Sequence, residues 1–157
     1  MQGNARVIEL LNDVLTAELT AINQYFIHAK LMENWGYERL AERTRSESID
    51  EMKHAEKVIE RIIFLEGVPN MQRLYPVKVG ESVPEQLRLD LDTEYESIKR
   101  LNDGIAACVE VGDNGTRALL EEMLVGEEEH ADWLETQLGL VDSLGVQLYL
   151  AQTIDVE

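Results

Sequence analysis

The chain has 157 residues, of which 31 are acidic and 14 are basic, so its net charge is −17. This length fits one domain with a substantial core, and the 45% hydrophobic content indicates a globular chain rather than a disordered one. The negative charge argues against direct binding to nucleic acid or to anionic membranes, which both select basic surfaces. An acidic field attracts cations, although many acidic proteins carry such charge simply for solubility.

Cys108 is the single cysteine, so neither an internal disulfide nor a cysteine-rich metal site is expected. The N-terminal segment does not resemble a signal peptide, because Glu9, Asp13 and Glu18 fall among its apolar positions. No apolar run approaches the length that spans a membrane. We therefore expect a cytoplasmic protein.

Apolar residues with helical spacing predict four long helices, at about 4–35, 37–66, 84–111 and 116–138, and a short fifth helix at 144–154. Trp35-Gly36, Gly67 and the run 112–115 mark the breaks between them, and Gly139 is expected to end the fourth helix. All three prolines fall within residues 67–84, so residues 67–83 are predicted to be an extended connection.

The connection lengths predict the topology. Short turns join helix one to helix two and helix three to helix four, so each pair forms an antiparallel hairpin. A helix of about 28 residues is roughly 42 Å long, and an extended connection of about 16 residues reaches roughly 50 Å. The connection can therefore run the length of the bundle. The fold expected for residues 1–157 is a single all-α, ferritin-like four-helix bundle with one long crossover and a short fifth helix.

Two Glu-x-x-His motifs carry the chemistry of the chain. Glu51 precedes His54, and Glu127 precedes His130, so in a helix each pair projects from one face, one turn apart. A carboxylate and an imidazole placed this way can bind one metal ion. Either motif alone is weak, because the same residues on a solvated helix face would form an ordinary ion pair.

The spacing around these motifs repeats along the chain. Glu18 lies 33 residues before Glu51, and Glu94 lies 33 residues before Glu127, so the whole set recurs with a period of 76 residues. Residues nearly equidistant from a hairpin turn sit at one level, so Glu18 should face the Glu51 motif and Glu94 the Glu127 motif. Four buried carboxylates repel one another unless cations neutralise them, which predicts a site for two divalent ions. The ligand types suit iron or manganese, and zinc would also be tolerated.

These residues resemble bacterioferritin, the haem-containing branch of the ferritins, along nearly the whole chain. The most specific stretches are 18–26, 47–55, 64–67, 127–130 and 133–136. The resemblance implies iron storage and detoxification by a ferroxidase, which oxidises Fe(II) to Fe(III) with O₂ or peroxide. The ferric mineral would fill a hollow shell of 24 subunits built from two-fold dimers, and a ferredoxin-type protein is a possible reductant.

Carried over position by position, the resemblance assigns six side chains to two iron ions per subunit. Glu18 and His54 would hold one ion, Glu94 and His130 the other, and Glu51 and Glu127 would bridge them. Tyr25, seven residues after Glu18, could hydrogen-bond a ligand or donate an electron, or it could simply be a core tyrosine.

The resemblance also implies haem b shared between two subunits, with Met52 as the axial ligand from each. Met52 is one residue past Glu51, about 100° around the helix, so it faces away from the metal side. Leu19, Ile22, Asn23 and Phe26 fit the matching pocket wall. The alternative is a methionine in an apolar dimer interface.

The chain also departs from the family pattern. Many relatives pair a histidine at the position of Ser46 with an acid at Asp50 as an iron site on the inner surface, where Glu47 is a further candidate; here the histidine is missing. Gly126, just before Glu127, weakens the fourth helix locally. His28 is expected to be structural or part of an interface. Four alternatives stay open: a haem-bearing electron-transfer or partner subunit of a mixed shell, a rubrerythrin-like di-iron peroxidase, an oxygenase and a purely structural bundle.

Overall fold

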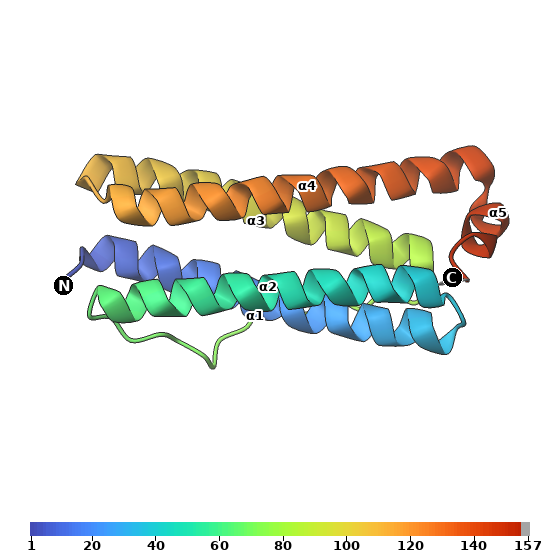
Figure 1. Ribbon diagram of the computed structural model, residues 1–157, viewed down its shortest axis with the longest axis horizontal. Coiled ribbons are helices and arrows are strands. Elements are labelled where there is room, and N and C mark those ends of the chain that lie inside the picture. Colours follow the sequence, from blue (N-terminus) through green and yellow to red (C-terminus); the bar gives the residue numbers. More distant parts are fainter. Residues whose placement is uncertain (155–157) are drawn as a thin grey trace.

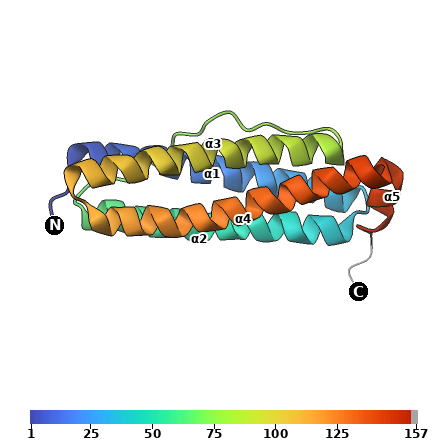
Figure 2. The same cartoon turned by 90° about the horizontal axis from the view of Figure 1, so that it is seen from above.

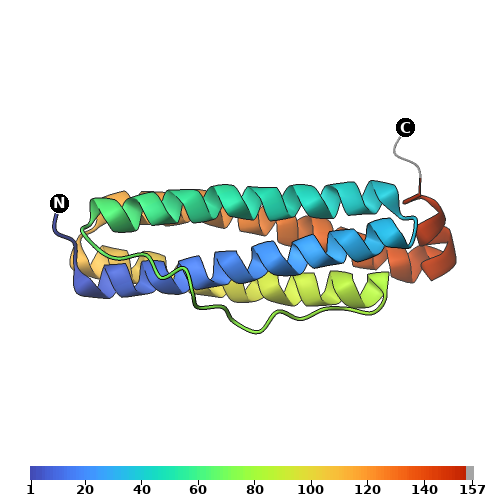
Figure 3. The same ribbon diagram turned by 90° about the horizontal axis from the view of Figure 1, so that it is seen from below.

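The computed structural model describes residues 1–154, which form four long antiparallel helices and a short fifth helix across one end of the bundle (Figure 1). The helices are α1 (Ala5–Asn34), α2 (Glu38–Phe64), α3 (Val83–Val111), α4 (Asn114–Leu144) and α5 (Val146–Ala151). The crossover between α2 and α3 runs along the bundle, as Figure 3 shows. This arrangement confirms the predicted ferritin-like bundle with one long crossover. Residues 155–157 of the predicted domain lie outside the described residues.

Polar side chains cap the N-terminal ends of α1, α3 and α4. Asn4 accepts a hydrogen bond from the Arg6 amide at 2.8 Å at the start of α1. Asp113 does the same for the Thr116 amide at 2.9 Å, so α4 begins at Asn114, two residues earlier than predicted. Arg61 of α2 also binds Asp113, at 3.1 Å. The start of α4 is therefore tied to the other hairpin.

The predicted end of the fourth helix at residue 138 is wrong. α4 continues through Gly139 to Leu144, and α5 covers Val146–Ala151 rather than 144–154. A glycine inside a helix costs only about 1 kcal/mol relative to alanine. Packing offsets that cost, because Val141 lies beyond the glycine in an apolar cluster with Tyr149 of α5. Gly145, with a φ of 81°, makes the turn that does end α4.

The core has two apolar parts with a polar layer between them. Across the bundle α1 lies beside α3, and α2 lies beside α4 (Figure 2). One apolar cluster includes Leu11 and Leu120 near the α3–α4 turn, and the other includes Met32 and Leu134 near the α1–α2 turn. Among residues 1–154, no helix combines the length and apolarity needed to cross a membrane.

A stripe of polar side chains on α1 holds the crossover in place. The crossover has no helix or strand of its own, so its amides need other partners. Four of them find acceptors on α1: Asn70 donates to Asn12 at 2.8 Å, Tyr75 to Thr20 at 2.9 Å, Lys78 to Gln24 at 3.2 Å, and Gly80 to His28 at 2.9 Å. The stripe repeats every fourth residue, which places it on one face of α1, and comprises Asn12, Thr16, Thr20, Gln24 and His28.

His28 is a structural residue within this stripe. Its Nε2 accepts from the Gly80 amide, so its Nδ1 carries the proton and donates to Asp90 of α3, 2.8 Å away. Asp90 also accepts from Gln24 Nε2 at 3.0 Å. All three side chains are buried. The network therefore joins α1, the crossover and α3.

We expect Gln24→Leu to lower the free energy of unfolding by about 2–4 kcal/mol, because it leaves the Lys78 amide without its acceptor and removes a donor from buried Asp90. Chemical denaturation at one fixed protein concentration measures the change. Asn102→Leu is the control, since that amide is exposed and bonds only the Ile98 carbonyl of its own helix. Equal stabilities for the two variants would contradict a structural role for the stripe.

Candidate metal centre

Six side chains from four helices meet in the polar layer of the core. α1 provides Glu18 and α3 provides Glu94, while α2 and α4 each provide a glutamate and a histidine one turn apart. The structure brings all six predicted residues together in two overlapping groups. These are Glu18, Glu51, His54 and Glu127 in the first group and Glu51, Glu94 and His130 in the second, with the ligand atoms of each group within 4.8 Å of one another.

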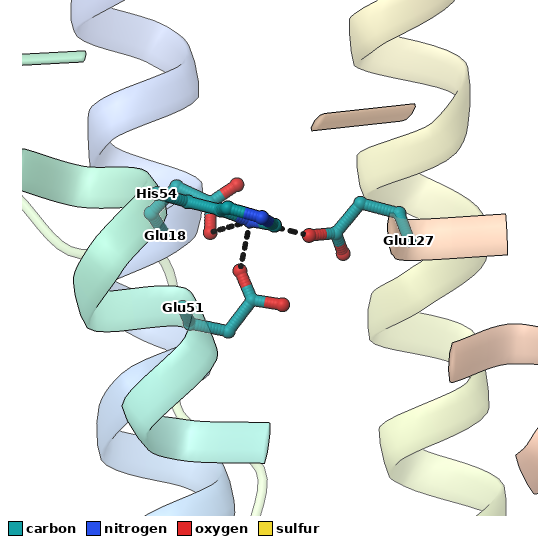
Figure 4. A group of neighbouring side chains, drawn as sticks. All are labelled: Glu18, Glu51, His54 and Glu127. Carbon is teal, nitrogen blue, oxygen red and sulfur yellow. Dashed lines mark hydrogen bonds and ion pairs between the residues drawn. The ribbon is translucent and has the colours of Figure 1, made fainter. Parts of the chain in front are cut away.

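His54 is the centre of the first group, as Figure 4 shows. Its Nδ1 lies 3.1 Å from Glu127 Oε1, 3.4 Å from Glu51 Oε2 and 3.8 Å from Glu18 Oε2. Glu127 therefore reaches across the bundle from α4 to the hairpin of α1 and α2. One metal ion placed between the imidazole and these three carboxylates could bind all four side chains.

His130 and Glu94 form the second group with Glu51. His130 Nδ1 lies 2.7 Å from Glu94 Oε1. Glu51 belongs to both groups, which is the position expected of a bridging carboxylate. Glu127 is grouped with the His54 side, and its charge also raises the pKa of Glu94 in the second group; its bridging role stays a prediction.

Tyr25 touches this second group. Its hydroxyl donates to Glu94, and its ring meets the His130 ring edge-on with centroids 5.2 Å apart. The tyrosine is fully buried. Of the roles considered for Tyr25, the structure therefore shows the hydrogen bond to a candidate ligand.

A chain of contacts on the α2–α4 side supports His130. Glu47 was among the predicted candidates, but the contacts of Arg43 and Trp133 were missed from the sequence. Arg43 binds Glu47 at 2.9 Å and stacks over the Trp133 ring at 4.3 Å. Glu47 Oε2 lies 3.6 Å from His130 Nδ1, and Trp133 stacks against the His130 ring. The only signal in the sequence was the four-residue spacing from Arg43 to Glu47 to Glu51, which puts the three on one helix face.

The electrostatics of the site favour bound positive charge. One carboxylate oxygen on each of Glu18, Glu51 and Glu94 is buried with no hydrogen-bond partner among the described residues. Burial and the charge of Glu127 raise the pKa of Glu18 to about 8, and burial raises the pKa of Glu94 well above its ordinary value. Burial opposes protonation of His54, but its hydrogen bond to Glu127 and the charges of Glu18 and Glu127 raise its pKa to about 10. Protons or metal ions must therefore offset the charge of these carboxylates, which fits a divalent metal site.

Two other predicted residues, Met52 and Asp50, lie outside the two groups. Met52 is 53% exposed, on a face of α2 that does not contribute to the site. Asp50 is exposed and lies 4.0 Å from Lys53. Ser46 and Asp50 both line a cavity on the α2–α4 side, so the position of the missing histidine does face that cavity.

The fold and the clustered carboxylates and histidines define a ferritin-like protein, and the family model of the ferritin-like domain matches residues 8–144. The bacterioferritin of Mycolicibacterium paratuberculosis is 52% identical over 154 residues, which cover 98% of this chain and 97% of that protein. The bacterioferritin of Streptomyces coelicolor is 51% identical over 155 residues, covering 99% and 93%. The solved structure of Mycobacterium tuberculosis bacterioferritin, BfrA, superposes with a TM-score of 0.97 at 50% identity, covering 99% of this chain and 98% of that one. This chain belongs to the bacterioferritin family.

Membership in this family establishes the activity. The protein is an iron-storage protein and a ferroxidase, and it carries the fold and the clustered side chains that this activity requires. The predicted family, fold class and function are thereby confirmed.

Proposed function

We propose that the six clustered side chains bind two iron ions in each subunit and that Fe(II) is oxidised there. The observation that carries this proposal is the convergence of four buried glutamates and two histidines from four different helices. The three carboxylate oxygens without partners among the described residues supply acceptor positions that cations would satisfy. An ordinary ion-pair network would not leave those oxygens unpaired.

The ligands divide between the two ions as the two groups suggest. Glu18 and His54 would hold one ion, Glu94 and His130 would hold the other, and Glu51 and Glu127 would be shared between them. Tyr25 orients Glu94, and Glu47 orients His130. Bound Fe(II) supplies the electrons that reduce O₂ or peroxide.

Removing the shared ligand should abolish rapid oxidation. We expect Glu51→Ala to slow aerobic Fe(II) oxidation at least about 100-fold, because both ions lose a carboxylate. The ferric product is followed by absorbance after Fe(II) and aerated protein are mixed. Glu56→Ala, an exposed glutamate of the same helix, should keep the wild-type rate. A wild-type rate in Glu51→Ala would refute this assignment.

We further propose that two subunits share one haem b through Met52. The exposed apolar side chains Phe26, Ile49 and Met52, each 42% to 53% exposed, lie on one outer face of α1 and α2. Phe26 and Ile49 also line a cavity of about 620 Å³ on that face. A thioether exposed beside apolar surface suits an axial haem ligand supplied by each of two facing subunits.

The haem assignment is tested with two equally exposed methionines. We expect Met52→Leu to be purified with little haem absorbance, whereas Met71→Leu, at 55% exposure compared with 53% for Met52, keeps it. The same haem content and the same spectrum in both variants would show that Met52 is not the ligand.

Storage requires an enclosed volume, so we propose a shell of 24 subunits assembled from two-fold dimers, located in the cytoplasm. The exposed apolar side chains of α1 and α2 favour burial against another subunit. The mineral would then grow inside the shell from Fe(III) formed at the metal centres.

Sedimentation velocity tests the assembly. We expect a single large particle with the mass of 24 chains in protein freed of mineral. A dimer with no larger species at micromolar concentration would contradict the shell, and a mixture with a second type of chain would point to a mixed assembly.

A further inference from the structure

The metal centre opens to one side of the bundle through a cavity between α2 and α4. The cavity has a volume of about 470 Å³ and is lined by Glu51, His54 and His130, so it reaches three of the six proposed ligands. Gly126 of α4 lies in the same lining. An ion moving between this cavity and the centre must pass these side chains.

His54 is the proposed ligand that the cavity exposes most. Its side chain is 20% exposed, whereas those of the other five are at most 5% exposed. The Nδ1 atom faces the carboxylates, and the neighbouring edge of the ring, formed by Cε1 and Nε2, faces Gly126. His54 therefore stands between the cavity and the rest of the centre.

Gly126 leaves the edge of His54 uncovered. A Cβ built at this position would lie 3.5 Å from Cε1 and 3.6 Å from Nε2 of His54, which is ordinary contact. The backbone of α4 is helical here and does not require glycine. Glycine even costs the helix about 1 kcal/mol relative to alanine. What it provides is open space beside the imidazole, which a larger side chain would fill.

The corresponding histidine of α4 has no such freedom. His130 is held by Glu94 at 2.7 Å, by the edge of Tyr25 and by the stacked ring of Trp133. Its side chain is 5% exposed. Of the two histidines, His54 is therefore the one that can move aside without disturbing packed neighbours.

We infer that Gly126 sets the rate at which metal ions enter and leave the di-iron centre, by giving the His54 ring room to move into the α2–α4 cavity. This inference rests on the proposed ligands and adds to them a residue that binds no metal. Filling the space beside His54 should slow exchange in both directions and leave the number of bound ions unchanged.

The test uses Co²⁺, whose absorbance reports binding and which does not turn over. Full-length protein freed of iron is loaded with Co²⁺ in a stopped-flow instrument, and release is then followed after excess chelator is added. We expect Gly126→Leu to slow loading and release together by about tenfold or more, corresponding to about 1.4 kcal/mol or more in each barrier. Leucine cannot bind the metal itself.

Gly139→Leu is the matched control, because it also replaces a glycine within α4 but meets nothing within 4 Å. Wild-type exchange rates in Gly126→Leu would overturn the inference. If Gly126→Leu binds no Co²⁺, the same experiment is done with Gly126→Ala. Slower Co²⁺ exchange in Gly126→Ala would support the inference, and a wild-type rate would overturn it. If Glu51→Ala binds Co²⁺ as the wild type does, the ligand assignment is refuted instead. Failure of the inference about Gly126 and failure of the proposed ligands can therefore be distinguished.

Discussion

Burying four carboxylates at one level of a helical bundle is unfavourable unless protons, hydrogen-bond donors or cations offset their charge. In this protein the four glutamates lie between two apolar clusters, so the clusters stabilise the bundle and the polar layer does not have to. The raised pKa values of Glu18 and Glu94 have the same origin, because burial disfavours the charged form of each carboxyl group. The proposed iron site thus lies where the fold most needs positive charge.

The repeated motif does not make the two halves of the centre equivalent. On the α4 side, His130 is enclosed by Tyr25, Trp133 and the Arg43–Glu47 pair. On the α2 side, His54 borders a cavity and faces a glycine. The same ligand types at the same spacing therefore have different surroundings, because their neighbours come from positions that the repeat does not match.

Most of the candidate site could be predicted from the sequence, because helix turns and a fixed spacing place the six side chains at one level. The supporting contacts could not be predicted, since Arg43 and Trp133 reach His130 through side-chain conformations that no spacing encodes. Gly139 was wrongly predicted to end the fourth helix. The free energy that a glycine costs the helix is smaller than the stabilisation from packing of the residues beyond it. From the sequence, Gly126 was expected only to weaken α4. The structure shows that it lies beside the His54 ring of α2.

The spacing of the polar stripe on α1 also constrains the length of the crossover. From Thr20 to His28 the helix rises about 12 Å, at about 1.5 Å per residue. The matching crossover segment from Tyr75 to Gly80 spans five residues, which cover about 17–18 Å at most when extended. The segment between these two hydrogen-bonded amides therefore has little length to spare. Surface connections usually tolerate insertions and deletions, but this one can change its side chains more readily than its length.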